Sequence, residues 1–226
     1  MTHWLFLILL LPAAYWLLVT VLGVLSVRKM SHPEPLLQPI QDMERLEDPQ
    51  GITDWARTHG FELNSQFDFD GLVGAGELKL AVEGWYLASR KLFLMHYHVQ
   101  NKFYFEFISG MEGGYSLTSS KSADSLTLPF PPKVFTQVFE KASLDELLQE
   151  HEKALAYFEE RFGVKPTDPD HPLQDLIIHS MKTQMAYVQS LPLWQLRIGW
   201  WHMSRRHNLR NRSVIEQIES LDQNRS

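Results

Sequence analysis

The first thirty residues have the most uniform hydrophobic pattern in the chain. The 24 residues from Trp4 to Val27 include no charged side chain, and Arg28 and Lys29 follow directly. A helix of this length spans roughly 36 Å, enough to cross a hydrocarbon layer of about 30 Å. We therefore expect residues 1–29 to form a transmembrane anchor, with Trp4 contacting one membrane interface and Arg28 and Lys29 contacting the other.

A cleavable signal peptide is the alternative interpretation of this segment. Such peptides begin with positive charge, continue with an apolar stretch of about 7–15 residues and end in small residues at the cleavage site. The start, Met1-Thr2-His3, holds no Lys or Arg, and the apolar stretch is much longer. The pattern favours a single-pass anchor. Because the positive charges follow the helix, the bulk of the chain is expected in the cytoplasm, at the cell membrane.

Beyond the anchor, a linker at residues 30–50 with four prolines leads into a pattern with the period of a β-strand. Apolar and polar side chains alternate, or apolar runs stand between turn residues, in segments 67–70, 78–83, 92–99, 103–108, 115–118 and 126–128. The connections are short, which favours antiparallel pairing because parallel strands need long crossovers. We expect an antiparallel sheet of about five or six strands.

The pattern becomes helical after the prolines near residue 130. Ser143 and Glu146 form the capping-box signature of a helix start, and Gly163 is placed to end that helix. A second amphipathic pattern begins near residue 170 and stops before Pro192. Strands followed by helices indicate an α+β domain over residues 51–190, with its C-terminal helices packed on the sheet.

The charge of −6 is divided unevenly along the chain. Residues 30–190 hold 24 acidic and 13 basic side chains, whereas residues 191–226 hold six arginines and three acidic side chains. An acidic domain argues against nucleic acid as a partner. The chain has no cysteine, which excludes disulfides, thiolate catalysis and cysteine-ligated metal sites.

His96 and His98 have the spacing of a pair of metal ligands. Residues two apart on a strand point to the same face, so both imidazoles can reach one ion. Glu106, on the following strand, is the nearest carboxylate and the expected third ligand. The same pattern also fits two histidines that only pack on a sheet face, and no organic cofactor is expected.

Residues 191–226 form a basic, Trp- and Arg-rich amphipathic tail in this interpretation. The side chains expected to contact the membrane are Trp194, Trp200, Trp201, Arg205 and Arg206. Tryptophan beside arginine is typical of a helix that lies in the membrane interface near anionic headgroups. Alternatively, the tryptophans belong to the core and the arginines are ordinary solvated charges.

Other polar patterns do not form a catalytic set. The glycines at 71, 74 and 76 precede a strand pattern, whereas a phosphate loop precedes a helix. His151 lies on the apolar stripe of its helix, where packing is the usual role. The sequence therefore favours a non-catalytic, membrane-anchored protein that binds or organises another membrane or cytoplasmic protein. The alternative is a membrane-tethered enzyme or lipid-handling domain that uses His96 and His98.

Overall fold

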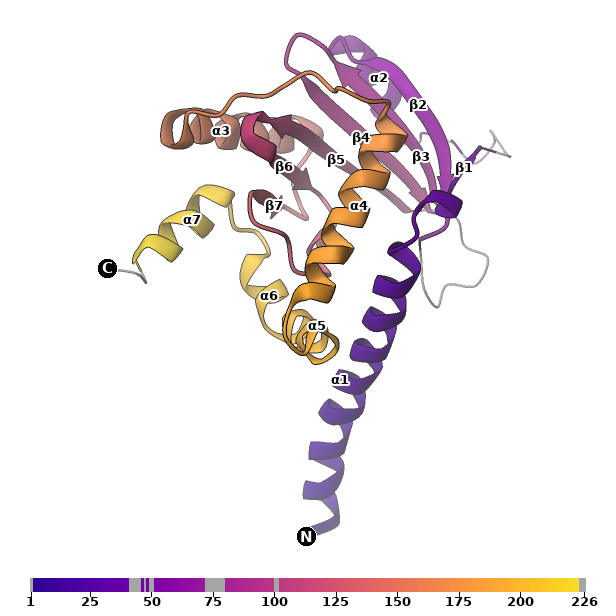
Figure 1. The fold of residues 1–226 in the computed structure, drawn as a ribbon, viewed down its shortest axis with the longest axis vertical. Helices are drawn as coiled ribbons and strands as arrows, with labels where there is room; N and C mark the ends of the chain where they lie inside the picture. The colour runs from indigo at the N-terminus through magenta and orange to yellow at the C-terminus, as the bar shows by residue number, and fades with distance from the viewer. Residues whose placement is uncertain are drawn as a thin grey trace.

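The computed structural model describes residues 2–40, 46, 48, 51–71, 80–99 and 102–223, with backbone alone at 2–9, 99 and 102. A seven-stranded sheet has helices on both faces, and one long helix extends away from it to the N-terminus (Figure 1). The helices are α1 (Thr2–Met30), α2 (Ile52–Thr58), α3 (Leu144–Phe162), α4 (Leu173–Ser190), α5 (Trp194–Met203), α6 (Arg205–Leu209) and α7 (Val214–Gln223). This is the expected α+β class.

The sheet is a meander in which neighbours in space are neighbours in sequence. Its strands are β1 (Leu37–Pro39), β2 (Glu62–Phe69), β3 (Leu80–Leu87), β4 (Leu92–Val99), β5 (Lys102–Met111), β6 (Tyr115–Ser120) and β7 (Val134–Val138). All pairs are antiparallel except β6–β7, which is parallel. The mostly antiparallel sheet is confirmed, with seven strands rather than five or six.

Two strands and one turn differ from the sequence expectation. β1 lies inside the Pro-rich linker and pairs with the end of β2, so this linker is partly built into the sheet. β7 follows the proline cluster and is too short to show a clear alternation. Residues 126–128 contain no strand, and Ala123–Leu126 forms the 3₁₀ helix η4, with Ser122 as its N-cap. Residues 72–79, with Gly74 and Gly76, lie outside the described residues.

One face of the sheet is covered by α2, α3 and α7. The start of α3 has the complete capping box: Ser143 Oγ accepts from Glu146 N at 3.3 Å, and the Glu146 carboxylate accepts from Ser143 N at 2.8 Å. Gly163 ends the helix in the left-handed conformation, with φ 66°. The buried side chains of α3, among them Leu147 and Phe158, pack on strands β3 to β7. The sequence prediction of this helix is confirmed.

The opposite face is covered by α4. Leu173 of α4 contacts the sheet at Gly84, where a Cβ atom would collide with the Leu173 side chain. Phe67, Val82 and Met95 complete this part of the core. The glycine in the middle of β3 is therefore a close-packing site between sheet and helix.

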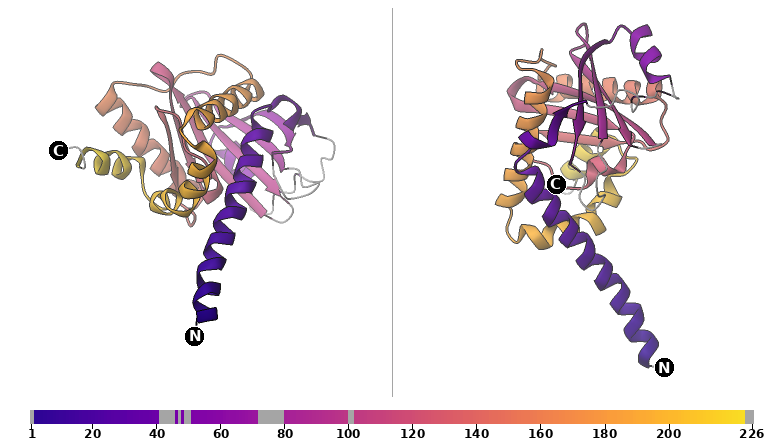
Figure 2. Two further views of the ribbon diagram at one scale, coloured as in Figure 1. Left: turned by 60° about the horizontal axis from the view of Figure 1, so that its bottom comes forward. Right: turned by 90° about the vertical axis from the view of Figure 1, so that its right-hand side faces the viewer.

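α5 packs across the C-terminal half of α1, while the N-terminal half of α1 extends away from the domain (Figure 2). Val27 of α1 and Ile198 of α5 are fully buried in one cluster with Met185 and Val188 of α4. By length and composition, residues Leu10–Met30 form a helix able to cross a membrane.

Residues 205–223 return to the sheet instead of forming a separate tail. α7 buries Val214 and Ile218 in the cluster that also contains Phe158 of α3. Ser213 caps this helix through Glu216, whose carboxylate accepts from Ser213 N at 2.8 Å. Within the expected tail region, α5 is the element that packs against α1.

Candidate functional site

His96 and His98 lie on β4 and face the same layer as α2 and α3. Their neighbour across the β3–β4 pair is Glu83, which stands directly opposite His96. The exposed fractions of Glu83, His96 and His98 are 5%, 0% and 2%. The structure thus brings together two imidazoles and one carboxylate inside the protein, and their ligand atoms lie within 4.8 Å of one another.

A single carboxylate oxygen lies between the two imidazoles. Glu83 Oε2 is 3.4 Å from His96 Nδ1 and 3.4 Å from His98 Nε2. The other oxygen, Oε1, accepts a hydrogen bond from Gln66 Nε2 at 2.9 Å. The imidazole ring centroids are 3.9 Å apart. Gln66 thereby orients Glu83 so that Oε2 points at both histidines.

The electrostatic state of the cluster follows from burial and these contacts. Burial works to raise the pKa of Glu83, but the polar contacts of its carboxylate with His96, His98 and Gln66 outweigh it and lower that pKa to about 2. Burial lowers the pKa of His96, against the opposing influence of Glu83. Asp48, which also accepts hydrogen bonds at the start of α2, adds a second negative charge near His96. At neutral pH Glu83 is therefore ionised beside a neutral His96.

Glu106 is not part of this cluster. On β5, His96 stands opposite Phe105, so Glu106 stands opposite Met95 and faces the other side of the sheet. There its carboxylate accepts hydrogen bonds from Ser120 at 2.8 Å and from Ser125. The structure thus separates Glu106 from His96 and His98. A signal for Glu83 exists in the sequence, because it is the one charged residue within the apolar run Leu80–Leu87.

His151 is also fully buried, but both of its nitrogens have partners. Gln137 Nε2 donates to Ser119 Oγ at 2.8 Å, which leaves the Ser119 hydroxyl proton for His151 Nδ1 at 2.9 Å. His151 Nε2 then donates to Ser109 Oγ at 3.1 Å. Burial lowers the pKa of His151 to about 3. This Ser–His arrangement is a closed packing network without access for a substrate.

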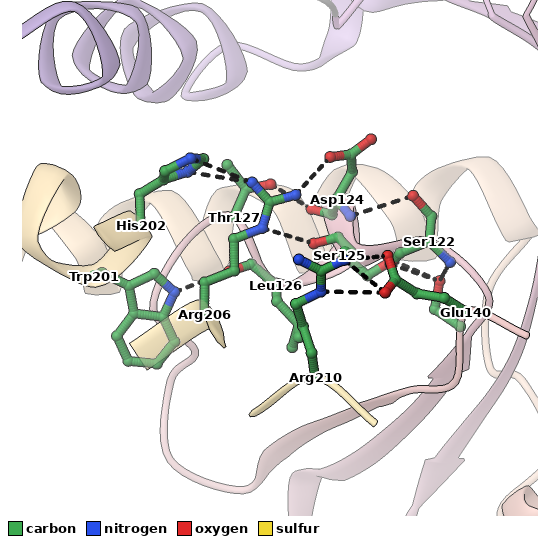
Figure 3. A network of polar contacts seen from close by, with 12 residues as sticks. Ser122, Asp124, Ser125, Leu126, Thr127, Glu140, Trp201, His202, Arg206 and Arg210 are labelled. Atoms are coloured by element: carbon green, nitrogen blue, oxygen red, sulfur yellow. Dashed lines mark hydrogen bonds and ion pairs between the residues drawn. The ribbon is translucent and has the colours of Figure 1, made fainter. Parts of the chain in front are cut away.

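A pocket of about 560 Å³ opens beside η4, where α5 and α6 meet the ends of β5 and β7. Four of its charged side chains form two ion pairs (Figure 3). Arg206 Nη2 donates to Asp124 at 2.9 Å, and Arg210 Nη2 donates to both oxygens of Glu140 at 2.7 and 2.6 Å. These pairs attach α6 to the domain. They also compensate the positive charges of these two arginines.

The residues expected to contact the membrane fall into two groups. Trp200, Arg205 and Arg28 are exposed, with Trp200 at 54%. The other described members take part in contacts within the protein. Trp194 packs beside α1, and Trp201 Nε1 donates to Leu126 O at 2.9 Å. Arg206 pairs with Asp124, and Lys29 Nζ is 2.9 Å from Asp70 Oδ1. Trp4 lies in α1, and its side chain is outside the described part of the structure.

Comparison of the chain with models of protein families, with curated proteins and with solved structures finds no match. A function for this chain therefore has to be inferred from its own residues and their geometry.

Proposed function

We propose that this chain is a single-pass membrane protein whose cytoplasmic α+β domain is held against the bilayer and binds another membrane or cytoplasmic protein without catalysing a reaction. The observation that carries this proposal is the packing of α5 across the C-terminal half of α1. A domain attached only through a flexible linker could take many orientations, whereas one packed on its own anchor has a single orientation relative to the membrane.

The position of α5 along α1 indicates where the bilayer surface lies. α5 contacts α1 from Trp16 to Val27. It also carries the exposed side chain of Arg197, and a charged side chain favours a position of α5 in the headgroup region over one in the hydrocarbon. The 19 residues from Thr2 to Thr20 then span about 28 Å, close to the thickness of the hydrocarbon layer. Exposed Trp200 on α5 fits the interface, where tryptophan is enriched.

The polar groups of the domain favour binding over catalysis. The Ser109–His151–Ser119 network is closed to solvent, and the arginines of the pocket are already paired with Asp124 and Glu140. The acidic domain favours a protein partner with a basic surface. A membrane-tethered enzyme remains the second candidate, and the cluster of Glu83, His96 and His98 is the observation that favours it.

Single cysteines provide the test, because the natural chain contains none. Thr2→Cys and Glu219→Cys are treated in intact cells with a membrane-impermeant maleimide. We expect Thr2→Cys to be labelled at once and Glu219→Cys only after permeabilisation. The reverse order would contradict the cytoplasmic placement, and release of the chain from membranes by alkaline carbonate would contradict the anchor.

The partner-binding function is tested by photo-crosslinking in native membranes. A photoreactive group at Glu160→Cys, on the exposed acidic face of α3, is compared with the same group at Trp200→Cys. We expect a discrete protein adduct from position 160 and lipid adducts from position 200. Only lipid and water products from every exposed position of α2 and α3 would refute protein binding at this surface.

A further inference from the structure

We propose that Glu83, His96 and His98 together bind one divalent transition-metal ion of the zinc class, on the sheet face that carries α2 and α3. Zinc accepts imidazole nitrogen and carboxylate oxygen, and sites with two histidines and one glutamate are a known ligand combination. The site is independent of how the domain is held at the membrane. Its presence or absence can therefore be established separately from the proposed function.

Two of the three distances between donor atoms match the edges of a tetrahedral zinc site. With zinc–ligand bonds of 2.0–2.1 Å, two ligands of a tetrahedron lie about 3.3 Å apart. Glu83 Oε2 is 3.4 Å from both His96 Nδ1 and His98 Nε2. An octahedral site with bonds of similar length would bring neighbouring ligands to about 2.9 Å. A direct charge-assisted hydrogen bond is also shorter, at about 2.7–2.9 Å.

The histidine pair has a buried nitrogen at the proposed site that the rest of the described chain does not satisfy. His96 Nδ1, which faces Glu83 Oε2, has no hydrogen-bond partner among the described residues. His96 Nε2 and His98 Nδ1, on the other sides of the two rings, have none there either, and the ion does not reach them. Buried polar groups are normally bonded, so an unpartnered buried imidazole nitrogen is a candidate metal ligand. His151 provides the comparison within the same molecule. It is equally buried, but Ser109 and Ser119 satisfy both of its nitrogens.

The charge around the cluster also favours a cation. Glu83 is buried, and its ion-pair neighbours in the described chain are the two imidazoles, with no lysine or arginine. A buried carboxylate without a cation is costly, whereas a metal ion both compensates its charge and coordinates the imidazoles. Gln66 holds the second oxygen of Glu83, the outer-shell contact that ligating carboxylates commonly have.

Such an ion joins β3 to β4 through their side chains. Three protein ligands leave one tetrahedral position for water or another small ligand. The ligands are nearly inaccessible in the folded chain and are not preassembled in the unfolded chain. Metal binding therefore stabilises the folded state.

The test uses the full chain in detergent, purified with an affinity tag that contains no histidine. The protein is incubated with Zn²⁺, separated from free metal by gel filtration and analysed by mass spectrometry for its metal content. We expect about one zinc per chain, a melting temperature that rises with Zn²⁺ and falls with chelator, and an X-ray absorption spectrum with two imidazole ligands.

Variants assign the site. His98→Gln and Glu83→Gln are expected to lower zinc affinity by at least about tenfold, and Gln66→Leu by about tenfold. The matched control is His171→Gln, an exposed histidine far along the chain, which should keep the metal. Wild-type protein that retains no zinc and shows no change in melting temperature with Zn²⁺ would overturn the proposal. So would zinc binding that is unchanged in a folded His98→Gln variant.

If the variants do not fold, Co²⁺ added to the wild type still decides the question. Tetrahedral Co²⁺ bound at this site gives visible d–d absorption that excess Zn²⁺ removes. Absence of these bands in folded protein would also overturn the proposal.

Discussion

Gly199 of α5 lies directly against Thr20 of α1. A Cβ atom on Gly199 would collide with Thr20 Oγ1 and would come within 2.8 Å of Trp16 Nε1. Thr20 Oγ1 itself donates back to Trp16 O at 2.7 Å, so its hydroxyl is satisfied within α1. One turn further along α1, a Cβ on Gly23 would collide with Ile198 of α5. Small residues on both helices let the backbones approach closely, as at crossings of membrane helices.

Replacing Gly199 with leucine should separate α5 from α1. The larger side chain cannot be placed beside Thr20 and Trp16 without moving one helix, so we expect faster hydrogen exchange in residues 194–203 and little change in the sheet. Hydrogen exchange followed by mass spectrometry, in detergent or nanodiscs, measures both regions.

The control for this helix pair is Gly110→Leu, because the nearest atom to a Cβ at that exposed position is 3.9 Å away. It should leave exchange in α5 unchanged. Equal exchange of α5 in the wild type and Gly199→Leu would mean that the two helices do not pack on each other as they do here.

His151 should make the domain less stable in acid. In the folded protein its pKa is lowered to about 3, whereas the unfolded chain has the ordinary value of 6.5. The unfolded state therefore binds the proton first as the pH falls, and stability is lost between about pH 6.5 and pH 3. From pH 7 to pH 5 this one group should remove about 2 kcal/mol from the free energy of unfolding.

Denaturant unfolding of the wild type and His151→Gln at pH 7 and pH 5 isolates this contribution. Glutamine does not titrate, so the free energy of unfolding of the His151→Gln variant should fall less between pH 7 and pH 5 than that of the wild type. The difference between the two proteins matters, because the other histidines titrate in both. The same pH dependence in both proteins would show that His151 is protonated or exposed in the folded state.

Gln137 should be essential for the docking of α7. Its side chain is fully buried, its Oε1 accepts from Val214 N at 3.0 Å, and its Nε2 donates to Ser119 Oγ and to Glu150 O. Gln137→Leu leaves the first backbone N–H of α7 without its partner. We expect a loss of about 2 kcal/mol in the free energy of unfolding, and faster hydrogen exchange in α7.

Gln149→Leu is the matched control, since Gln149 is an exposed glutamine on α3. It should change the free energy of unfolding by less than about 0.5 kcal/mol. If the two variants behave alike, the hydrogen bonds of Gln137 contribute nothing specific to stability.

Ser143 should contribute to the stability of the folded domain only as the N-cap of α3. Ser143→Ala removes the acceptor for Glu146 N and should lower the free energy of unfolding by about 1 kcal/mol, whereas Ser143→Asp keeps an acceptor and should preserve most of it. Denaturant titration of the three proteins measures these differences. An alanine variant as stable as the wild type would exclude a stabilising role for the capping box.

The sequence predicts those parts of the fold that depend on residues close together in the chain. The period of two between residues 67 and 108, the short turns and the box of Ser143 and Glu146 are local patterns, and the corresponding strands and helix are present. β1 and β7 could not be predicted in this way. A strand of three or five residues has too few positions for a period, and its pairing depends on a partner strand.

The candidate site shows the same limit. The i, i+2 spacing correctly puts His96 and His98 on one face, but the partner carboxylate depends on how strands align. The β4–β5 register places His96 opposite Phe105, and this turns Glu106 to the other face. A shift of one residue would reverse that result. Glu83 lies on β3, the strand on the other side of β4. Its position beside His96 depends on the turn between β3 and β4, not on the turn between β4 and β5.

What the sequence by itself determined is the apolar helix at the start, the α+β order of strands and helices, and the pair of histidines on one strand, because each is a property of neighbouring residues. Only the tertiary structure decided that Glu83 joins the histidines, that Arg206 and Arg210 are paired with Asp124 and Glu140, and that Gly199 meets Thr20. These contacts join different elements of the chain, and strand register and helix packing select them from many pairings that the same residues allow.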